Sequence, residues 1–200
     1  MRRLTLAVLP MLLCLLCACS GKGKTMQAQK DFRARLCAAG SCSFRLEASE
    51  DFDGRVCDFT LDCVCGTDGS SELTVVFPES VAGVRARTEG ESGELIYGET
   101  VLTFGFAPDA RLAPLSVTAT LVRAWSGGDL ASSGPDGDET CAVYELGYDG
   151  EQISVYTWFS PDGTPSRAEL ALGGAVLCRA KLADFHYAGG NNEAAETNLG

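Results

Sequence analysis

The sequence predicts a mainly β fold of the α+β class, in which a curled antiparallel sheet or incomplete β-barrel is lidded by short helices. Three observations predict it. Apolar and polar residues alternate along many short segments, so the apolar ones share one face of a strand. Asp-Gly pairs, which are typical of hairpin turns, separate several of these segments. Strands outnumber helical segments by about nine to two, so an apolar sheet face has little helical cover and must curl.

The alternation is clearest between Arg55 and Cys65, where Cys57, Phe59 and Leu61 fall on one face and Asp58, Thr60 and Asp62 on the other. Other strands are predicted at residues 40–48, 72–77, 84–88, 93–97, 101–106, 139–148, 152–159, 167–172 and 175–185. A short helical turn is predicted at residues 79–82, a helix that begins at a proline at 114–125, and a flexible loop at 126–138.

The N-terminus predicts export. Basic Met1-Arg2-Arg3 precedes a thirteen-residue apolar run, Leu4 to Leu16, whereas a membrane-spanning helix needs about 20 apolar residues. The run ends in Leu16-Cys17-Ala18-Cys19, which resembles the bacterial lipobox. The resemblance implies diacylglycerol transfer to the Cys19 thiol, cleavage after Ala18 and acylation of palmitate type. It places the protein at the extracytoplasmic face of the cell membrane or envelope. The alternative is an ordinary signal peptide cleaved at Ala18.

Four segments follow from these observations. Residues 1–18 are expected to be the lipoprotein signal peptide and residues 19–30 a lipidated flexible tether, because SGKGKTMQAQK is small and polar. Residues 31–187 are enough for one domain with a core. Residues 188–200 have the composition of a disordered tail.

The charge of the mature part excludes one class of partner. After cleavage it keeps 27 acidic and 14 basic residues, a formal charge of −13. Nucleic acid binding needs clustered Lys and Arg, so no nucleic acid partner is expected. The same balance argues against the body of the domain lying flat on anionic headgroups.

Seven cysteines remain beyond Cys19, an odd number that cannot all pair within one chain. Burial as small apolar side chains is the favoured interpretation. A disulfide, either Cys37–Cys42 or between strands, and a soft-metal site are the alternatives, but the Cys-x₂-Cys spacing of structural zinc sites is absent. No metal or cofactor is therefore expected. The seven are Cys37, Cys42, Cys57, Cys63, Cys65, Cys141 and Cys178.

Catalysis is not expected. His186 is the single histidine, and a serine or cysteine nucleophile would have no other imidazole as its base. No Gly-x-Ser-x-Gly segment accompanies it. We expect a strand-end histidine without a catalytic role.

The order of motifs resembles the Lol-type lipoprotein carrier and receptor family over most of residues 37–187. The resemblance rests on the alternating strand Cys57 to Cys65, on Leu73-Thr74-Val75-Val76-Phe77-Pro78, on Ala82-Gly83-Val84, on Gly93-Glu94-Leu95-Ile96-Tyr97 and on Pro165-Ser166-Arg167-Ala168-Glu169-Leu170. It implies an incomplete antiparallel barrel lidded by helices, whose hollow binds lipid or acyl chains. This sequence departs from the family in its few basic residues and its many inward cysteines.

The expected function is a membrane-anchored lipoprotein that binds lipid or acyl chains in an apolar cavity, with the helix near residues 115–125 as a movable lid. Its expected partners are the membrane, through the lipid on Cys19, a hydrophobic ligand and an envelope protein. The alternative is a structural or interaction lipoprotein with a filled core and no ligand. The expected cavity-lining residues are Phe44, Leu46, Phe59, Leu61, Leu73, Val75, Phe77, Leu102, Phe104, Trp125 and Trp158.

Overall fold

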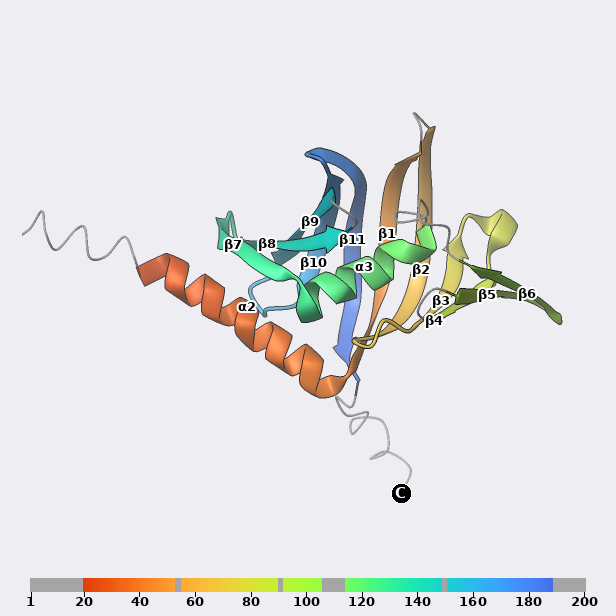
Figure 1. Ribbon diagram of the computed structural model, residues 1–200, viewed down its shortest axis with the longest axis horizontal. Helices are drawn as coiled ribbons and strands as arrows, with labels where there is room; N and C mark the ends of the chain where they lie inside the picture. Colours follow the sequence, from red (N-terminus) through yellow and green to blue (C-terminus); the bar gives the residue numbers. More distant parts are fainter. Residues whose placement is uncertain (1–19, 53–54, 90–91, 106–113, 149–150, 189–200) are drawn as a thin grey trace, which may run out of the picture.

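The computed structural model describes residues 20–52, 55–89, 92–105, 114–148 and 151–188 (Figure 1). The predicted signal peptide, Cys19 and the predicted tail from residue 189 onward lie outside these residues. Within them, no helix is both long enough and apolar enough to cross a membrane.

Eleven antiparallel strands form one open sheet, in the order β6-β5-β4-β3-β2-β1-β11-β10-β9-β8-β7 (Figure 1). Two helices, α2 (Ser20–Ala39) and α3 (Pro114–Gly127), and a 3₁₀ turn, η1 (Glu79–Val81), accompany it. The predicted fold class is confirmed. The strands are β1 (Ser41–Phe52), β2 (Arg55–Gly66), β3 (Ser71–Phe77), β4 (Arg85–Glu89), β5 (Ser92–Tyr97), β6 (Thr100–Gly105), β7 (Asp129–Asp136), β8 (Glu139–Tyr148), β9 (Glu151–Phe159), β10 (Pro165–Leu172) and β11 (Ala175–Tyr187).

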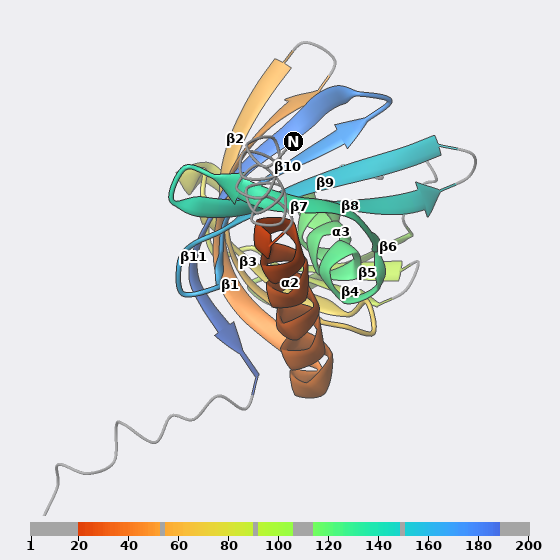
Figure 2. The ribbon, with the colours of Figure 1, turned by 90° about the vertical axis from the view of Figure 1, so that its left-hand side faces the viewer.

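The sheet consists of two meanders, β1 to β6 and β7 to β11, which join in the middle of the sheet. The junction is the pairing of β1 with β11, from Cys42 opposite Tyr187 to Glu50 opposite Cys178. Strands β6 and β7 are the two edges, so the barrel does not close. Both helices lie on the same side of the sheet (Figures 1 and 2). We call the face that packs against them the inner face and the opposite one the outer face.

The strands form where the alternation predicted them, because one face of the sheet is buried and the other is exposed to solvent. In β2, Phe59, Leu61, Cys63 and Cys65 are buried, and the residues between them are exposed or half-buried. The outer face carries ion pairs between neighbouring strands, such as the one between Arg45 Nε and Asp62 Oδ1 at 2.7 Å. Such exposed pairs fix register more than they stabilise.

The tether prediction is wrong from residue 20 onward, since helix α2 begins at Ser20. Tertiary contacts stabilise this polar segment as a helix: Phe32 and Leu36 are fully buried on the inner face. The buried Tyr144 hydroxyl also donates a hydrogen bond to Gln29 Oε1 at 3.2 Å. Helical segments of modest intrinsic propensity are commonly held in this way by packing of one face.

The predicted loop at 126–138 is also wrong in part, because β7 occupies Asp129–Asp136 and pairs with β8. Its sequence, DLASSGPD, has little apolar alternation because it is an edge strand with a single buried side chain, Ser133. The predicted helix at 114–125 and the turn at 79–82 are confirmed as α3 and η1. The strand predicted at 101–106 ends at Gly105, and Phe106 lies outside the described residues.

All seven cysteines beyond Cys19 are free thiols, which rules out the disulfide alternative in this structure. Cys42, Cys63, Cys65 and Cys178 are buried, as predicted. Cys37 and Cys57 are exposed, and Cys141 is half-buried, so burial does not extend to every thiol. His186 is exposed near the end of β11, as expected.

Candidate functional site

Helix α3 crosses the inner face and covers its centre. Pro114 begins the helix, and the side that faces the sheet is almost entirely apolar. This surface meets strands β2, β3 and β8. A helix with one continuous apolar side is held by burial and by few directional bonds. The buried apolar side chains are Val117, Leu121, Val122, Ala124 and Trp125.

Trp125 is the centre of the contact between α3 and the rest of the domain. Its ring lies 6.0 Å from Phe32 of α2, 5.8 Å from Phe44 of β1 and 6.2 Å from Phe185 of β11, centroid to centroid. The indole Nε1 donates a hydrogen bond to Thr157 Oγ1 at 2.9 Å. This bond satisfies the polar atom of a fully buried ring.

Arg33 of α2 fastens the C-terminal end of α3. Its guanidinium donates hydrogen bonds to the carbonyl oxygens of Trp125 (Nε, 2.8 Å), Ala124 (3.4 Å) and Gly128. It also lies 5.6 Å from the Tyr144 ring centroid. The last carbonyls of a helix have no partner within the helix, so Arg33 caps α3 and binds it to α2.

We expect Arg33→Ala to destabilise the domain by about 1–3 kcal/mol, because it leaves these carbonyls without their charged donor. Loss of the cap should also raise hydrogen–deuterium exchange in α3 more than in β1. The matched control is Arg35→Ala, since Arg35 is exposed and its guanidinium lies 5.3 Å from the Tyr187 ring centroid, away from the end of α3. Equal exchange in α3 for the two variants would contradict the capping role of Arg33.

Three buried thiols lie close together on the inner face, and that of Cys65 interacts with Thr118 of α3. Cys42 of β1 stands opposite Cys65 of β2, and Cys63 is two residues away on the same face. Burial raises the pKa of Cys42 and of Cys65 to about 12, with the Thr118 hydroxyl of α3 opposing part of the rise at Cys65. The thiols therefore stay protonated and weakly nucleophilic. No group of three His, Cys, Asp or Glu side chains among the described residues could hold a metal ion.

Glu50 is the one acidic side chain of the described chain that is fully buried on the inner face. It lies between Cys57 of β2 and Cys178 of β11 in the register, and it is 1% exposed. Neither carboxylate oxygen has a hydrogen-bond partner. Burial raises the pKa of this carboxyl to about 7. Glu50 was not expected from the sequence, although it is in phase with the inward residues Phe44, Leu46 and Ala48, which indicates a buried position.

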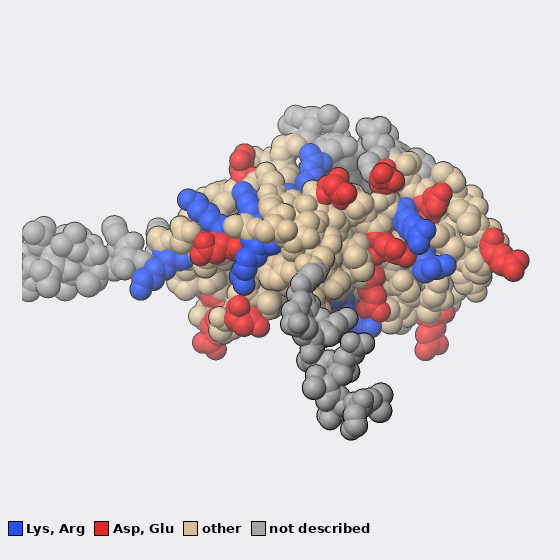
Figure 3. Space-filling model, turned by 90° about the horizontal axis from the view of Figure 1, so that it is seen from below, with Lys and Arg blue, Asp and Glu red and all other residues tan. Residues whose placement is uncertain are grey.

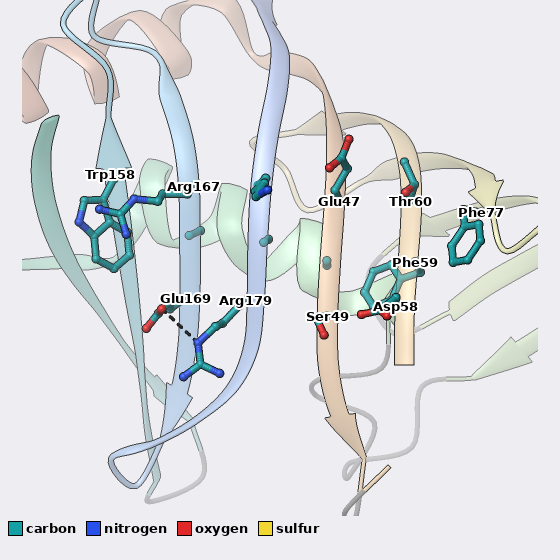
Figure 4. A pocket seen from close by; sticks show the side chains of 14 residues that line it. Glu47, Ser49, Asp58, Phe59, Thr60, Phe77, Trp158, Arg167, Glu169 and Arg179 are labelled. Atoms are coloured by element: carbon teal, nitrogen blue, oxygen red, sulfur yellow. Dashed lines mark hydrogen bonds and ion pairs between the residues drawn. The ribbon is translucent and has the colours of Figure 1, made fainter. Parts of the chain in front are cut away.

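The outer face bears a groove of about 500 Å³ that runs across strands β10, β11, β1 and β2 (Figure 4). Arg167, Lys181, Glu47 and Thr60 follow one another in register along one of its walls. Trp158 lies at one end, with the Arg167 guanidinium 4.0 Å from its ring centroid, and Phe77 at the other. Both charge signs line the groove, so it is not a purely apolar site.

The structure brings together six of the eleven expected cavity residues. These six are buried in one cluster on the inner face, with Val75 packed partly buried against it: Phe44, Leu46, Phe59, Leu61, Leu73 and Trp125. Trp158 and Phe77 instead belong to the outer groove, and Leu102 is 60% exposed on β6. The Phe104 side chain lies outside the described part of the chain.

Comparison with known proteins gives likenesses of fold alone. No family model and no curated protein matches the sequence. Among solved structures, the chain is similar to a LolA superfamily protein from Nitrosomonas europaea, at 14% identity and a TM-score of 0.48 over 80% of this chain and 92% of that one.

Two mycobacterial structures are similar as well. Lipoprotein LppX of Mycobacterium tuberculosis matches at 12% identity and a TM-score of 0.39, over 80% of this chain and 95% of that one. LprF of Mycobacterium bovis matches at 9% identity and a TM-score of 0.42, over 82% and 94%.

Proposed function

We propose that this chain is a membrane-anchored lipoprotein, attached through lipid on Cys19, that binds lipid or acyl chains on its inner face beneath α3. The observation that carries the proposal is the contact between α3 and the sheet. A single amphipathic helix covers the centre of the inner face with Val117, Leu121, Val122 and Trp125, all fully buried. If α3 moves aside, the surface that it leaves is apolar and large enough for an alkyl chain.

The free energy for such binding would come from desolvation. At roughly 25 cal/mol per Å², an alkyl chain that buries a few hundred Å² gains several kcal/mol before the costs of ordering and of lid displacement. In the structure the apolar side chains of α3 cover this surface, so the ligand would replace helix side chains of the same apolar character. Replacement of the helix side chains by the ligand therefore needs no charged group. The protonated thiols of Cys42 and Cys65 add to the apolar lining.

Catalysis has no support from the geometry. The single imidazole, His186, is exposed on β11, and the buried thiols have raised pKa values. The proposed activity is accordingly binding.

A second candidate function is a structural or interaction lipoprotein of the envelope. The observation that favours it is the close packing of the core with α3 in place. The core is filled without a ligand among the described residues, since four of its large side chains have no exposed surface: Leu46, Leu73, Leu121 and Trp125. In this case α3 would never lift.

The decisive experiment locks the lid. Thr118 of α3 faces the Cys65 thiol of β2, so Thr118→Cys sets two thiols against each other across the interface between lid and sheet. We expect the reduced variant to take up a fluorescent fatty acid as the unmodified protein does. After oxidation it should lose at least tenfold in uptake, because a disulfide prevents α3 from lifting, and reductant should restore it.

Thr118→Ser, which keeps the hydroxyl, is the matched control and should respond to neither oxidation nor reduction. Solvent extraction and mass spectrometry of the unmodified protein then identify any lipid that it retains. Uptake that persists in the oxidised variant, with the disulfide confirmed by mass, would place the ligand elsewhere. No uptake by any form, and no extracted lipid, would favour the filled-core function.

A further inference from the structure

The charge of the chain is divided between helix α2 and the rest of the mature protein. Helix α2 carries five basic residues and one acidic residue, Asp31. From residue 40 onward the chain carries 9 basic and 26 acidic residues. Figure 3 shows several Lys and Arg side chains at the end of the molecule that bears α2. The five basic residues are Lys22, Lys24, Lys30, Arg33 and Arg35.

Three of the described cations on α2 are exposed, whereas Arg33 points toward α3 and Tyr144, and the exposed Arg35 also lies 5.3 Å from the Tyr187 ring centroid. Gln29, Phe32 and Leu36 occupy the side of the helix that packs on the inner face. Lys24, Lys30 and Arg35 are exposed on the remaining surface, and they form no ion pair with another described residue. Lys24 and Arg35 are three helical turns apart, so this exposed surface extends for about 16 Å along the helix.

The position of this surface identifies its partner. Helix α2 begins at Ser20, the residue after Cys19, so no linker separates the proposed lipid anchor from the helix. Anionic phospholipid headgroups attract basic side chains that lie within about a Debye length of the membrane surface. Arg35 is about 24 Å along the helix from the anchor, so α2 brings all its exposed cations within that distance when it lies along the membrane surface.

We propose that the exposed face of α2, carrying Lys24, Lys30 and Arg35, docks on anionic phospholipid headgroups and orients the domain on the membrane. The inference rests on the proposed membrane anchorage at Cys19. The anionic headgroups repel the acidic remainder of the domain and attract the basic helix. Both effects favour the same orientation, with α2 against the headgroups and the strands away from them. The outcome is a fixed orientation, in which the lid helix α3 and the inner face keep one position relative to the bilayer.

The test removes the lipid and measures the electrostatic contact alone. The chain from residue 19 with Cys19→Ser contains every described residue, and its binding is measured by flotation. The vesicles are made of phosphatidylcholine, either alone or with phosphatidylglycerol as about a third of the lipid. We expect binding to the anionic vesicles only, and its loss at about 0.5 M salt, where screening shortens the range of the attraction.

The triple variant Lys24→Glu, Lys30→Glu, Arg35→Glu should bind the anionic vesicles at least tenfold more weakly. The matched control, Arg55→Glu, Arg85→Glu, Lys181→Glu, changes the net charge equally at three exposed cations outside α2 and should keep most of the binding. Equal loss in both variants, or equal binding to neutral vesicles, would overturn the proposal.

The proposed lipid-binding function is tested separately by fatty-acid uptake on the same samples. A triple variant that takes up the fatty acid but does not float supports α2 docking and leaves that function intact. A protein that floats on anionic vesicles and takes up no fatty acid supports docking and contradicts the lipid-binding function. Membrane anchorage is tested in turn by lipid labelling of the unmodified chain and its loss in Cys19→Ser.

Discussion

Trp125→Ala is expected to destabilise the domain by about 3–5 kcal/mol, the range for removing a large aromatic side chain from a core. The ring is fully buried and contacts aromatic rings from α2, β1 and β11. The substitution therefore leaves a cavity at the point where both helices meet the sheet. It also leaves Thr157 Oγ1 without the indole donor. Urea unfolding followed by far-ultraviolet circular dichroism measures the loss.

Trp125→Phe separates the two contributions. It keeps an aromatic ring among Phe32, Phe44 and Phe185 and removes the Nε1 donor, so we expect a loss of about 1 kcal/mol from the bond, plus a smaller packing term. If Trp125→Ala cost no more than Trp125→Phe, the ring would not be the centre of the contact between α3 and the sheet.

Glu50→Gln is expected to stabilise the domain at pH 8 by roughly 3 kcal/mol and to change little at pH 4. Burial raises the pKa of the Glu50 carboxyl from its ordinary value of 4.5 to about 7 in the folded state. Below pH 4.5 both states carry the proton, so the carboxyl adds no pH-dependent penalty. Between pH 4.5 and 7 the unfolded chain releases the proton while the folded chain keeps it, so stability falls as pH rises. Above pH 7 the folded state holds an unpartnered buried charge.

Denaturant unfolding of both proteins between pH 4 and pH 8 tests this dependence. Glu47→Gln is the matched control, because Glu47 lies on the same strand with its side chain exposed on the outer face. It should show no comparable gain at pH 8. A pH-independent difference between Glu50→Gln and the unmodified protein would mean that the Glu50 carboxyl is not strained by burial.

The sequence predicted most of the sheet because its strands obey a simple rule. Between Cys57 and Cys65 each inward position is apolar, and Asp58, Thr60 and Asp62 alternate with them on the outer face, so both the strand and its buried face could be predicted directly. Helix α2 and strand β7 could not, because their stability comes from partners distant in sequence. Thr25 Oγ1 of α2 donates to the Ser133 carbonyl of β7, 108 residues away, and no local pattern encodes that contact.

The candidate site was predicted in part for the same reason. Phe44 and Leu46 were assigned correctly to the inner face because polar residues flank them. Trp158 was expected in the cavity, but the phase of β9 places Thr157 on the inner face instead, where it accepts the hydrogen bond from Trp125. Tryptophan is normally buried in preference to threonine, but on β9 Thr157 faces inward and Trp158 outward. Glu50 on β1 is a second exception, since it is a charged residue at a buried position.

The pairing of β1 with β11 sets the order in which the fold can be completed. Ser41 and Ala188 are joined by a backbone hydrogen bond, yet almost the whole domain separates them in sequence. During synthesis, which proceeds from the N-terminus, the β1–β6 meander can form early. The edge of β1 that pairs with β11 stays without a partner strand until β11 is made. Contacts of such long sequence separation form slowly. Truncation before Ala175 would leave two half-sheets with unpaired central edges, which makes the last strand the step that protects the nascent protein from aggregation.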